Sequence, residues 1–490
     1  MSKPVILAID QGTTNTKAIA IDAAGRIVAK AAVAMQVSYP KPGWAEQSAR
    51  AIWDSVRQVI AETVAQLNAP VAALAISNQR ETIVAWDAAT GEPIGPAVIW
   101  QCRRSADRCA ALRAAGHEDM VVDRTGLTLD PLFPAAKLAW LLDDVPGARN
   151  RAERGQIRAG TIDSWLLWNL TGGTVHATDH SNASRTQLFD TRSLQWSDEL
   201  GALFNVPPAV LPQVLPSNSR FGTIVADVTA LRAGTPIHAM MGDSHAALFG
   251  HGVRSPGMAK ATYGTGSSLM ALTGGRVTSR HGLSGTIAWS TSKGVVHALE
   301  GNISVSGQAA AFMAEMLGLE SAGALSTLAA TVSDSNGCVF VPALVGLGAP
   351  YWRDDARGMI TGMSLGTKPA HLARAALEAI AFQVADVLDA MAADLGRPVT
   401  RLAVDGGASR NDFLMQFQAD IADCTLTRGA VAEVSAIGAA SMAALGLGLS
   451  ELAQAGSTET FTPQFSEAER LAAKARWKSA IAQTLLAATR

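Results

Sequence analysis

A chain of 490 residues is too long for one ordinary hydrophobic core, and its length predicts two or three domains. Hydrophobic residues make up 48% of the sequence and charged residues 17%, a balance that is typical of globular proteins and excludes a disordered chain. The formal charge of −2 lacks the basic excess that nucleic acid or an anionic membrane attracts, and no apolar run approaches the ~18 residues of a membrane span. We therefore expect neither nucleic acid nor membrane as a partner.

The cysteines and histidines do not form a metal-binding pattern. The 4 cysteines and 9 histidines show none of the short spacings that zinc sites use. The N-terminal stretch runs into an apolar strand that ends in an aspartate, which is unlike a signal peptide. We expect reduced thiols and a cytoplasmic location.

The first predicted element is a β-hairpin with a polar tip. Val5–Ile9 is wholly apolar, as in a strand that is covered on both faces, and it ends in Asp10 and the turn Gly12-Thr13-Thr14. Lys17–Ile21 is compatible with a returning strand, and a second turn leads to a third strand. Such a turn can offer amides and hydroxyls to an anion without a helix dipole, or it can simply be a turn.

A polar break then interrupts two apolar strands in "ALAISNQRETIVAW". Arg80 and Glu81 lie in this break, and a further strand is predicted to end at Trp100. Charged groups near a core must be paired or functional. The two side chains could offer a donor and an acceptor to adjacent substrate hydroxyls, or they could form a structural ion pair.

The stretch "GTPIHAMMGDSHAALFGHG" places Asp243 after an apolar strand and before a helical run, Ala246–Phe249. An aspartate in that position can be the N-cap of the helix, and the residues alone favour this role. Asp243 could instead be a carboxylate that takes a proton from a hydroxyl group.

The hairpin device recurs in the second half of the chain. "MAKATYGTGSSLMALTGG" predicts strand, Gly-Thr-Gly turn and strand again, which suggests two related halves. "RLAVDGGASRNDFLMQFQADIA" then predicts a strand, a Gly-Gly turn and an amphipathic helix. Such a junction suits a nucleotide, although it is also an ordinary α/β turn. Strands that alternate with helices such as Pro369–Ala393 indicate α/β domains.

Taken together, these segments resemble the FGGY family of carbohydrate kinases, in its glycerol kinase branch, within the actin/hexokinase/Hsp70 superfamily. The matching segments cover nearly the whole chain and are DQGTTNTK, SNQRET, GTIDSWLLWNLTGG, SNASRTQLFD, GDSHAALFG, YGTG, GLGAPYWRDDARG and VDGGASRN. The resemblance implies an α/β fold of two ribonuclease-H-like domains that flank a deep cleft. The domain of residues 1–246 would hold the sugar or polyol, the first phosphate loop and the catalytic aspartate. The domain of residues 247–490 would hold the second phosphate loop and the adenosine.

The same resemblance implies ATP and Mg²⁺, a small polyol or sugar as acceptor, and a homodimer. Asp243 would be the catalytic base, and Asp10 would organise the metal through water. The acceptor would be held by Arg80, Glu81, Trp100, Leu132, Asp243, Ser244 and Ser268. The nucleotide would be bound by Thr13, Thr14, Lys17, Gly264, Thr265, Gly307, Gly407, Ala408 and Asn411, with Lys17 where glycerol kinases usually have arginine.

The chain departs from the glycerol kinase pattern at acceptor positions. Leu132 replaces a tyrosine, Ser244 a glutamine and Ser268 an aromatic residue, and Ala311 stands where a glutamine is usual. A pocket whose lining shrinks usually fits a larger ligand, so we expect a longer polyol or a small ketose. A glycerol pocket with compensating changes elsewhere would carry the same substitutions. Some glycerol kinases are inhibited by a sugar bisphosphate and carry a Gly-Gly-x-Arg stretch before the catalytic base. This chain lacks that stretch, so we do not expect the same regulation.

Two other functions share part of this pattern. A xylulose- or ribulose-type kinase belongs to the same family, but SNQRET and IWQ are closer to glycerol kinases. A nucleotide-gated clamp such as actin or the Hsp70 ATPase domain shares the phosphate hairpins. Nothing in a clamp requires Asp243 or the Arg80-Glu81 pair.

Overall fold

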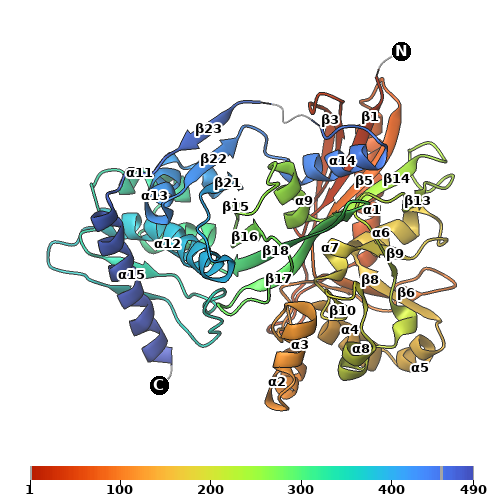
Figure 1. Cartoon of the computed structure of the whole chain (residues 1–490), viewed down its shortest axis with the longest axis horizontal. Helices are drawn as coiled ribbons and strands as arrows, with labels where there is room; N and C mark the ends of the chain where they lie inside the picture. The colour runs from red at the N-terminus through yellow and green to blue at the C-terminus, as the bar shows by residue number, and fades with distance from the viewer. Residues whose placement is uncertain (1–2, 453–455, 489–490) are drawn as a thin grey trace. The chain divides into compact units, whose positions relative to one another are not determined.

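The computed structural model describes residues 3–452 and 456–488, and the chain packs as two compact units (Figure 1). Unit 1 consists of Met1–Gly252, Gly285–His297 and Glu433–Ala455, and unit 2 of Val253–Ser284, Ala298–Ala432 and Gly456–Arg490. A single division at residue 246 was expected from the sequence. The packing differs from it, because two later segments also belong to unit 1.

The larger sheet of unit 1 has six strands in the order β13-β14-β5-β1-β2-β3. They span β1 (Val5–Gln11), β2 (Asn15–Ile21), β3 (Ile27–Ala34), β5 (Val71–Asn78), β13 (Gly222–Thr223) and β14 (Pro236–Gly242). β2 pairs antiparallel with β1 and with β3, whereas β5 pairs parallel with β1 and with β14. The predicted N-terminal hairpin and its third strand are confirmed.

Helices cover both faces of this sheet. Leu7 and Ile9 of β1 lie in one buried cluster with residues of α1 (Ala49–Val64) and α6 (Ile162–Leu170). Ile6 and Ala8 alternate with them and are also buried, so they face the other side, where α14 (Val434–Gly446) packs against β1, β5 and β14. Burial on both faces explains why β1 has no polar alternation.

Close packing of two helices explains why the late segment Glu433–Ala455 belongs to unit 1. α14 packs against α9 (Asp243–Gly250), and each helix contributes a glycine to the contact. A Cβ atom at Gly438 would overlap the backbone of Ala246, and one at Gly250 would overlap Val434. The two backbones therefore approach more closely than side chains would allow.

Unit 1 also contains a four-stranded sheet with the order β4-β7-β6-β8. Its strands are β4 (Glu46–Gln47), β6 (Ile83–Asp87), β7 (Ala97–Val98) and β8 (Ile157–Thr161). The remaining elements before residue 252 are α2 (Ala106–Ala114), α3 (Glu118–Thr125), α4 (Pro134–Asp144), α5 (Ala148–Glu153), β9 (Ala177–Asp179), α7 (His180–Ala183), β10 (Phe189–Asp190), β11 (Gln195–Trp196), α8 (Asp198–Phe204), η1 (Pro208–Val210) and β12 (Gln213–Leu215). The strand that was expected to end at Trp100 is the two-residue β7, because the chain turns at residues 100–101.

A second large sheet has the order β17-β18-β16-β15-β21-β22-β23. Its strands are β15 (Met258–Tyr263), β16 (Ser267–Leu272), β17 (Ser284–Thr291), β18 (Gly294–Ile303), β21 (Arg401–Asp405), β22 (Thr425–Gly429) and β23 (Thr458–Phe461). Strands β15, β16, β21, β22 and β23 lie in unit 2, whereas β17 from Gly285 onward and β18 up to His297 belong to unit 1. β16 is antiparallel to β15 and β18, and β21 is parallel to β15 and β22. The order β18-β16-β15-β21-β22 therefore repeats the order and directions of β3-β2-β1-β5-β14. This confirms the two related halves.

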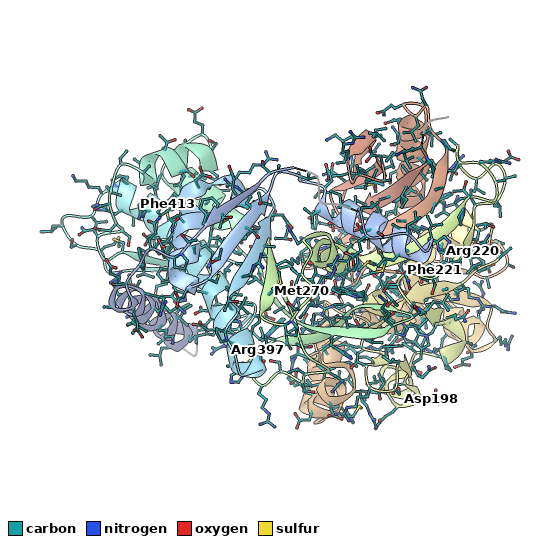
Figure 2. All side chains as sticks on the ribbon, turned by 45° about the horizontal axis from the view of Figure 1, so that its top comes forward. Asp198, Arg220, Phe221, Met270, Arg397 and Phe413 are labelled. Carbon is teal, nitrogen blue, oxygen red and sulfur yellow. The ribbon has the colours of Figure 1, made fainter. Side chains whose placement is uncertain are left out.

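Helices pack around the second sheet in one large hydrophobic cluster. The remaining elements of unit 2 are α10 (Gly307–Met316), α11 (Ala322–Ala329), β19 (Val339–Val341), β20 (Met359–Thr361), α12 (Pro369–Leu395), η2 (Ala408–Arg410), α13 (Asp412–Ala422) and α15 (Glu467–Ala488). Figure 2 shows the side chains of this unit, with Met270 marking β16 and Phe413 marking the first turn of α13. Within residues 3–452 and 456–488, no helix combines the length and the apolarity that a membrane crossing requires.

Candidate active site

The tip of the first hairpin is held by side chains from elsewhere in unit 1. The amide of Gly12 donates to the carbonyl of Asn15 at 2.9 Å and closes the turn. Thr13 is fixed three times: Gln47 Nε2 donates to its carbonyl at 2.8 Å, Trp100 Nε1 donates to its hydroxyl at 2.9 Å, and that hydroxyl donates to Gln79 Oε1 at 3.2 Å. Thr14 is exposed next to it.

Two glutamines in this network were not singled out in the sequence. Gln47 and Gln79 are buried, and Gln79 Nε2 donates to Gln47 Oε1 at 2.9 Å. Gln79 lies within SNQRET, so the motif signalled it. Gln47 ends the short strand β4, and no local pattern marks it. Trp100, which we expected to contact the acceptor, is 39% exposed and bonds Thr13 at the tip of the first hairpin.

Asp10 lies at the end of β1, where its carboxylate accepts a hydrogen bond from Ser77 Oγ at 3.1 Å. Burial raises the pKa of Asp10 to about 6, although the nearby Lys17 ammonium opposes the shift. A buried carboxylate of this kind gains stability from a cation. Among the described residues, no group of three or more Asp, Glu, His or Cys side chains is arranged so that it could hold a metal ion.

Lys17 faces Asp10 across the hairpin and has a partner from a distant segment. Its Nζ atom donates to Glu433 Oε2 at 2.7 Å, and Glu433 precedes α14. Burial alone would lower the pKa of Lys17, but its hydrogen bond to Glu433 and the charge of Asp10 raise the pKa above its ordinary value. The ammonium is thus charged at the side of the hairpin tip. Lys17 and Glu433 are more than 400 residues apart in the sequence, so no local pattern predicted that they form a pair.

Arg80 and Glu81 belong to a chain of buried charges. Arg80 Nε donates to Asp243 Oδ1 at 3.2 Å, while Arg80 Nη1 lies 3.9 Å from Glu81 Oε1. Arg185 Nε donates to Glu81 Oε1 at 2.7 Å. Glu81 also has a φ angle of 61°, a strained backbone conformation that is frequent at functional sites. Arg80 therefore pairs with both carboxylates, more closely with Asp243 than with Glu81.

Asp243 is the first residue of α9, and Gly242 is the N-cap. The N-cap interpretation of Asp243 is therefore wrong, and the helix begins earlier than the expected Ala246. Asp243 Oδ1 also accepts from the amide of Ser244 at 2.6 Å, while 39% of the Asp243 side chain stays exposed. A Cβ atom at residue 242 would lie 2.6 Å from Arg80 Cγ, so glycine is required for Arg80 to reach Asp243. The carboxylate is oriented from one side and accessible from the other.

A buried lysine ties together the loops that carry three expected acceptor residues. Lys137 of α4 donates through Nζ to the carbonyls of Glu81 and Leu132, both at 2.6 Å, and to that of Ile99 at 3.3 Å. Burial lowers the pKa of Lys137 to about 7. Ile99 directly precedes Trp100, so one side chain positions the backbone at or beside all three residues. The sequence shows only a lysine in an apolar helix, and its role was missed.

The tip of the second hairpin, in unit 2, is closed by backbone groups. Gly264 N donates to Gly266 O at 2.9 Å, Gly307 N donates to Gly264 O at 3.0 Å, and Ser306 N donates to Thr265 O at 2.9 Å. Gly307 is the first residue of the ten-residue helix α10. A helix N-terminus beside a glycine-rich turn suits an anionic phosphate group. Thr265 is exposed at this tip.

The Gly-Gly turn after β21 leads into the short 3-10 helix η2 before α13 begins at Asp412. This differs slightly from the helix that we expected directly after the turn. Asn411 is the N-cap of α13: its Oδ1 accepts from Leu414 N at 3.1 Å, and its Nδ2 donates to Ser326 Oγ at 2.8 Å. Gly407 is exposed and Ala408 is half-buried, so both are accessible to a ligand.

The three acceptor positions at which the chain departs from glycerol kinases have different surroundings. In unit 1, Leu132 is half-buried and Ser244 is 7% exposed. In unit 2, the hydroxyl of Ser268 donates to Glu300 Oε1 at 3.0 Å, and Lys260 Nζ donates to the Ser268 carbonyl at 3.3 Å. Lys260 and Glu300 are buried and were not expected from the sequence. Unit 2 thus carries a polar cluster where the family pattern has an aromatic ring.

Comparisons with known proteins address the family directly. Models of the N-terminal and C-terminal domains of the FGGY family of carbohydrate kinases match residues 5–250 and 259–447. The chain belongs to this family of carbohydrate kinases. The resemblance inferred from the sequence is confirmed, and membership in an enzyme family excludes the nucleotide-gated clamp.

Similar proteins include two kinds of kinase. The chain is 46% identical over 492 residues to a glycerol kinase of Symbiobacterium thermophilum, covering 98% of each chain. It is 47% identical over 493 residues to an apulose kinase of Pectobacterium atrosepticum, covering 99% of each. The crystal structure of Plasmodium falciparum glycerol kinase with ADP matches with a TM-score of 0.94 at 31% identity, covering 99% of this chain and 98% of that one. The two-domain α/β fold is confirmed, and identity alone does not separate the two acceptors.

Proposed function

We propose that this kinase transfers the γ-phosphate of ATP to a terminal hydroxyl of an acceptor larger than glycerol, either a longer polyol or a small ketose. One observation carries the choice of acceptor. The groups expected to perform the chemistry, Asp243 and Arg80-Glu81, are retained, while Leu132, Ser244 and Ser268 replace larger or more polar residues of the glycerol kinase pattern. The similarity to an apulose kinase, at the same level as to glycerol kinases, supports this choice.

The polar cluster in unit 2 also favours an acceptor with additional hydroxyls. Ser268 both donates to the buried Glu300 and occupies less space than an aromatic ring. A hydroxyl group of a ketose or longer polyol can donate and accept, so it can bond to a serine hydroxyl. A site built to bond a hydroxyl discriminates strongly against an acceptor that lacks it.

In the proposed reaction, Asp243 accepts the proton of the acceptor hydroxyl. The hydroxyl oxygen forms the new bond to phosphorus, the bond between the γ-phosphorus and the β,γ-bridging oxygen breaks, and ADP leaves. Arg80 orients Asp243 through its 3.2 Å hydrogen bond, and Arg185 holds Glu81 as an acceptor for substrate hydroxyls. Lys137 positions the three loops around them.

The nucleotide groups divide between the units. Thr13, Thr14 and Lys17 of unit 1 and the tip at Gly264 and Thr265 of unit 2 are proposed to bind phosphates. Gly307, Gly407, Ala408 and Asn411 are proposed to line the nucleotide. We place Mg²⁺ at Asp10 through water, because Mg²⁺ keeps several waters and takes one or two carboxylates together with substrate phosphates. When bound, it neutralises charge on the phosphates.

Steady-state kinetics with glycerol, xylitol and apulose tests the acceptor. We expect kcat/KM to be highest for apulose or xylitol, and a preference for glycerol would contradict the proposal. The double variant Leu132→Tyr/Ser268→Phe should move the preference toward glycerol. A higher kcat/KM with xylulose or ribulose than with any of these acceptors would favour the xylulose- or ribulose-type kinase, and a ketose over a longer polyol.

Two further expectations come from the family resemblance. A homodimer is expected, and sedimentation velocity would test it. A cytoplasmic location agrees with the use of ATP, and fractionation of cells that express the protein would test it.

A further inference from the structure

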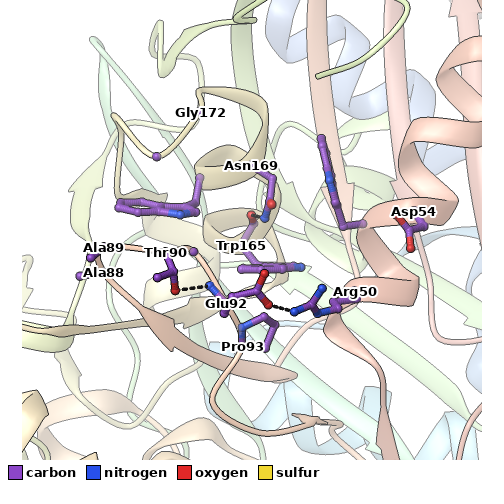
Figure 3. A pocket seen from close by; sticks show the side chains of 14 residues that line it. Arg50, Asp54, Ala88, Ala89, Thr90, Glu92, Pro93, Trp165, Asn169 and Gly172 are labelled. Atoms are coloured by element: carbon purple, nitrogen blue, oxygen red, sulfur yellow. Dashed lines mark hydrogen bonds and ion pairs between the residues drawn. The ribbon is translucent and has the colours of Figure 1, made fainter. Parts of the chain in front are cut away.

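A cavity of about 430 Å³ opens in unit 1 and shares no lining residue with the candidate active site (Figure 3). Its walls come from the first turn of α1, the turn between β6 and β7, and the C-terminal end of α6 with the following Gly172 and Gly173. Its volume lies within the ~300–1,000 Å³ that small-molecule sites occupy. The proposed kinase reaction leaves it without a role.

Three tryptophans line this cavity, and they are rigidly packed from behind. Trp165 is almost fully buried, and its Nε1 donates to the carbonyl of Ala49 at 2.9 Å. The buried Trp86 packs against Trp165 and Trp168, with ring centroids 5.3 and 5.9 Å away. Trp53 of α1 is half-buried. Trp53 and Trp168, both half-buried, therefore present the aromatic surface, whereas Trp165 is only 2% exposed.

Two glycines keep the edges of one ring accessible. Gly91 and Gly173 both have positive φ angles, and both line the cavity. A Cβ atom at Gly91 would lie 3.2 Å from Trp168 Nε1, and one at Gly173 would lie 3.2 Å from Trp168 Cζ2. Side chains at both positions would press on the part of the ring around Nε1 and Cζ2.

Polar groups lie beside the aromatic surface. Arg50 and Glu92 form an ion pair, and the amide of Glu92 donates to the hydroxyl of Thr90 at 3.2 Å (Figure 3). The Arg50 and Glu92 side chains remain 67% and 51% exposed, so the five guanidinium donors and the carboxylate lone pairs are only partly used. Asp54 is exposed one turn after Arg50. Donors and acceptors thus lie side by side.

We propose that this cavity is an accessory binding site for a neutral carbohydrate, either a monosaccharide or a sugar alcohol. Sugar hydroxyls both donate and accept, which matches the Arg50–Glu92 pair and Asp54. The partly positive C–H groups of a sugar face are attracted to the negative face of an indole ring.

The charges of the lining residues favour a neutral ligand over an anionic or a cationic one. One arginine and two carboxylates give the lining a net charge of −1, which disfavours a phosphorylated or otherwise anionic ligand. The guanidinium of Arg50 opposes a cation such as a quaternary ammonium, which would otherwise suit an aromatic cage. A neutral polyhydroxyl ligand meets neither penalty.

Fluorine NMR of the full chain labelled with fluorotryptophan tests the proposal without using activity. Single Trp→Phe variants assign the resonances of Trp53, Trp165 and Trp168. We expect D-glucose, D-xylose or xylitol to shift these three resonances in a saturable manner at millimolar concentrations. Shifts of Trp100 alone, no shift with any of the three ligands, or shifts that only choline, adenosine or inorganic phosphate produces would each overturn it.

Variants of exposed residues sharpen the test, because they leave the buried rings in place. Arg50→Ala and Asp54→Ala should each weaken binding roughly tenfold, as the loss of a hydrogen bond to a charged group does. Gln58→Ala is the control, since Gln58 is an exposed residue of the same helix that bonds Glu62 and lies outside the cavity. Equal weakening by Arg50→Ala and Gln58→Ala would overturn the assignment of the ligand to this cavity.

Discussion

The two hairpin tips occupy equivalent positions in sheets with the same strand order, yet they are held in different ways. In unit 1, side chains of Gln47, Gln79 and Trp100 hold Thr13. In unit 2, backbone amides and carbonyls close the tip around Gly264 and Thr265. The same fold can therefore hold a hairpin tip by side chains, which one substitution can reshape, or by backbone groups, which depends on the absence of a Cβ atom.

The ends of the equivalent strands also differ in charge. In unit 1 the acid lies on the first strand, where Asp10 pairs with Ser77 of β5. In unit 2 the acid lies on the other strand of the equivalent pair, because Thr262 of β15 is paired with Asp405 of β21. The duplicated framework thus assigns an acidic group to different strands in each unit, and only unit 1 carries it on the hairpin itself.

The first prediction has the largest expected effect and tests whether the proposed proton acceptor lies in unit 1. Asp243→Asn keeps the shape of the side chain but removes the proposed proton acceptor, so kcat should fall by ~10²–10⁴-fold. The affinity for ATP, measured by calorimetry, should stay unchanged, because Asp243 is not among the residues proposed to bind the nucleotide. Asp144→Asn at the exposed end of α4 is the control. Near-normal turnover of Asp243→Asn, or a loss of ATP affinity as large as the loss of kcat, would contradict the role of Asp243 as proton acceptor.

The second prediction concerns the backbone-built tip. A Cβ atom at Gly266 would overlap the carbonyl of Ile303, so Gly266→Ala must displace the loop. Overpacking of this kind costs ~1–3 kcal/mol, and we expect nucleotide affinity to fall roughly tenfold or more. Gly275→Ala is the matched control, because nothing lies within 4 Å of its Cβ position. Equal affinities of the two variants would show that the tip does not bind the nucleotide.

The third prediction concerns the tip that side chains hold. Gln47→Ala removes the hydrogen bonds to Thr13 O and Gln79 and leaves buried polar groups unpaired, at a cost of ~1–3 kcal/mol. The KM for ATP should rise several-fold with little change in KM for the acceptor. Gln58→Ala, on the exposed side of α1, should leave both values unchanged. An increase confined to the acceptor KM would assign Thr13 to the acceptor instead.

The smallest expected effect uses the acid that only unit 1 carries on its hairpin. Burial raises the pKa of Asp10 to about 6 from its ordinary 3.8, so the folded state binds more protons than the unfolded state between these values. The contribution of Asp10 to stability therefore falls as the pH rises from 3.8 to 6. Without Mg²⁺, Asp10→Asn should be more stable than the parent at pH 7.5 and lose much of that advantage at pH 5. Thermal unfolding at both pH values measures this, and a pH-independent difference would contradict it.

Local patterns were sufficient for the hairpins and the strand–turn–helix junctions. The apolar run Val5–Ile9, the Gly-Thr turns and the amphipathic spacing of Phe413, Leu414, Phe417 and Ile421 depend on neighbouring residues. In α13 the last three of these side chains are buried and Phe413 is half-buried. Helix starts were less accurate. Asp243 begins α9 because Gly242 supplies the N-cap, and a capping preference cannot show which of two adjacent residues takes that position.

The sequence by itself determined the fold class, the two related halves and the set of segments that carry the kinase family pattern. Only the tertiary structure showed that Arg80 pairs with Asp243, that Arg185 holds Glu81 and that Lys137 ties three loops together. It also placed Glu433–Ala455 with unit 1 through the contact of α14 with α9. The physical reason is the same in each case. Hydrophobic period and turn chemistry act over a few residues, whereas burial of a charge selects its partner from any segment that the fold brings within hydrogen-bond distance.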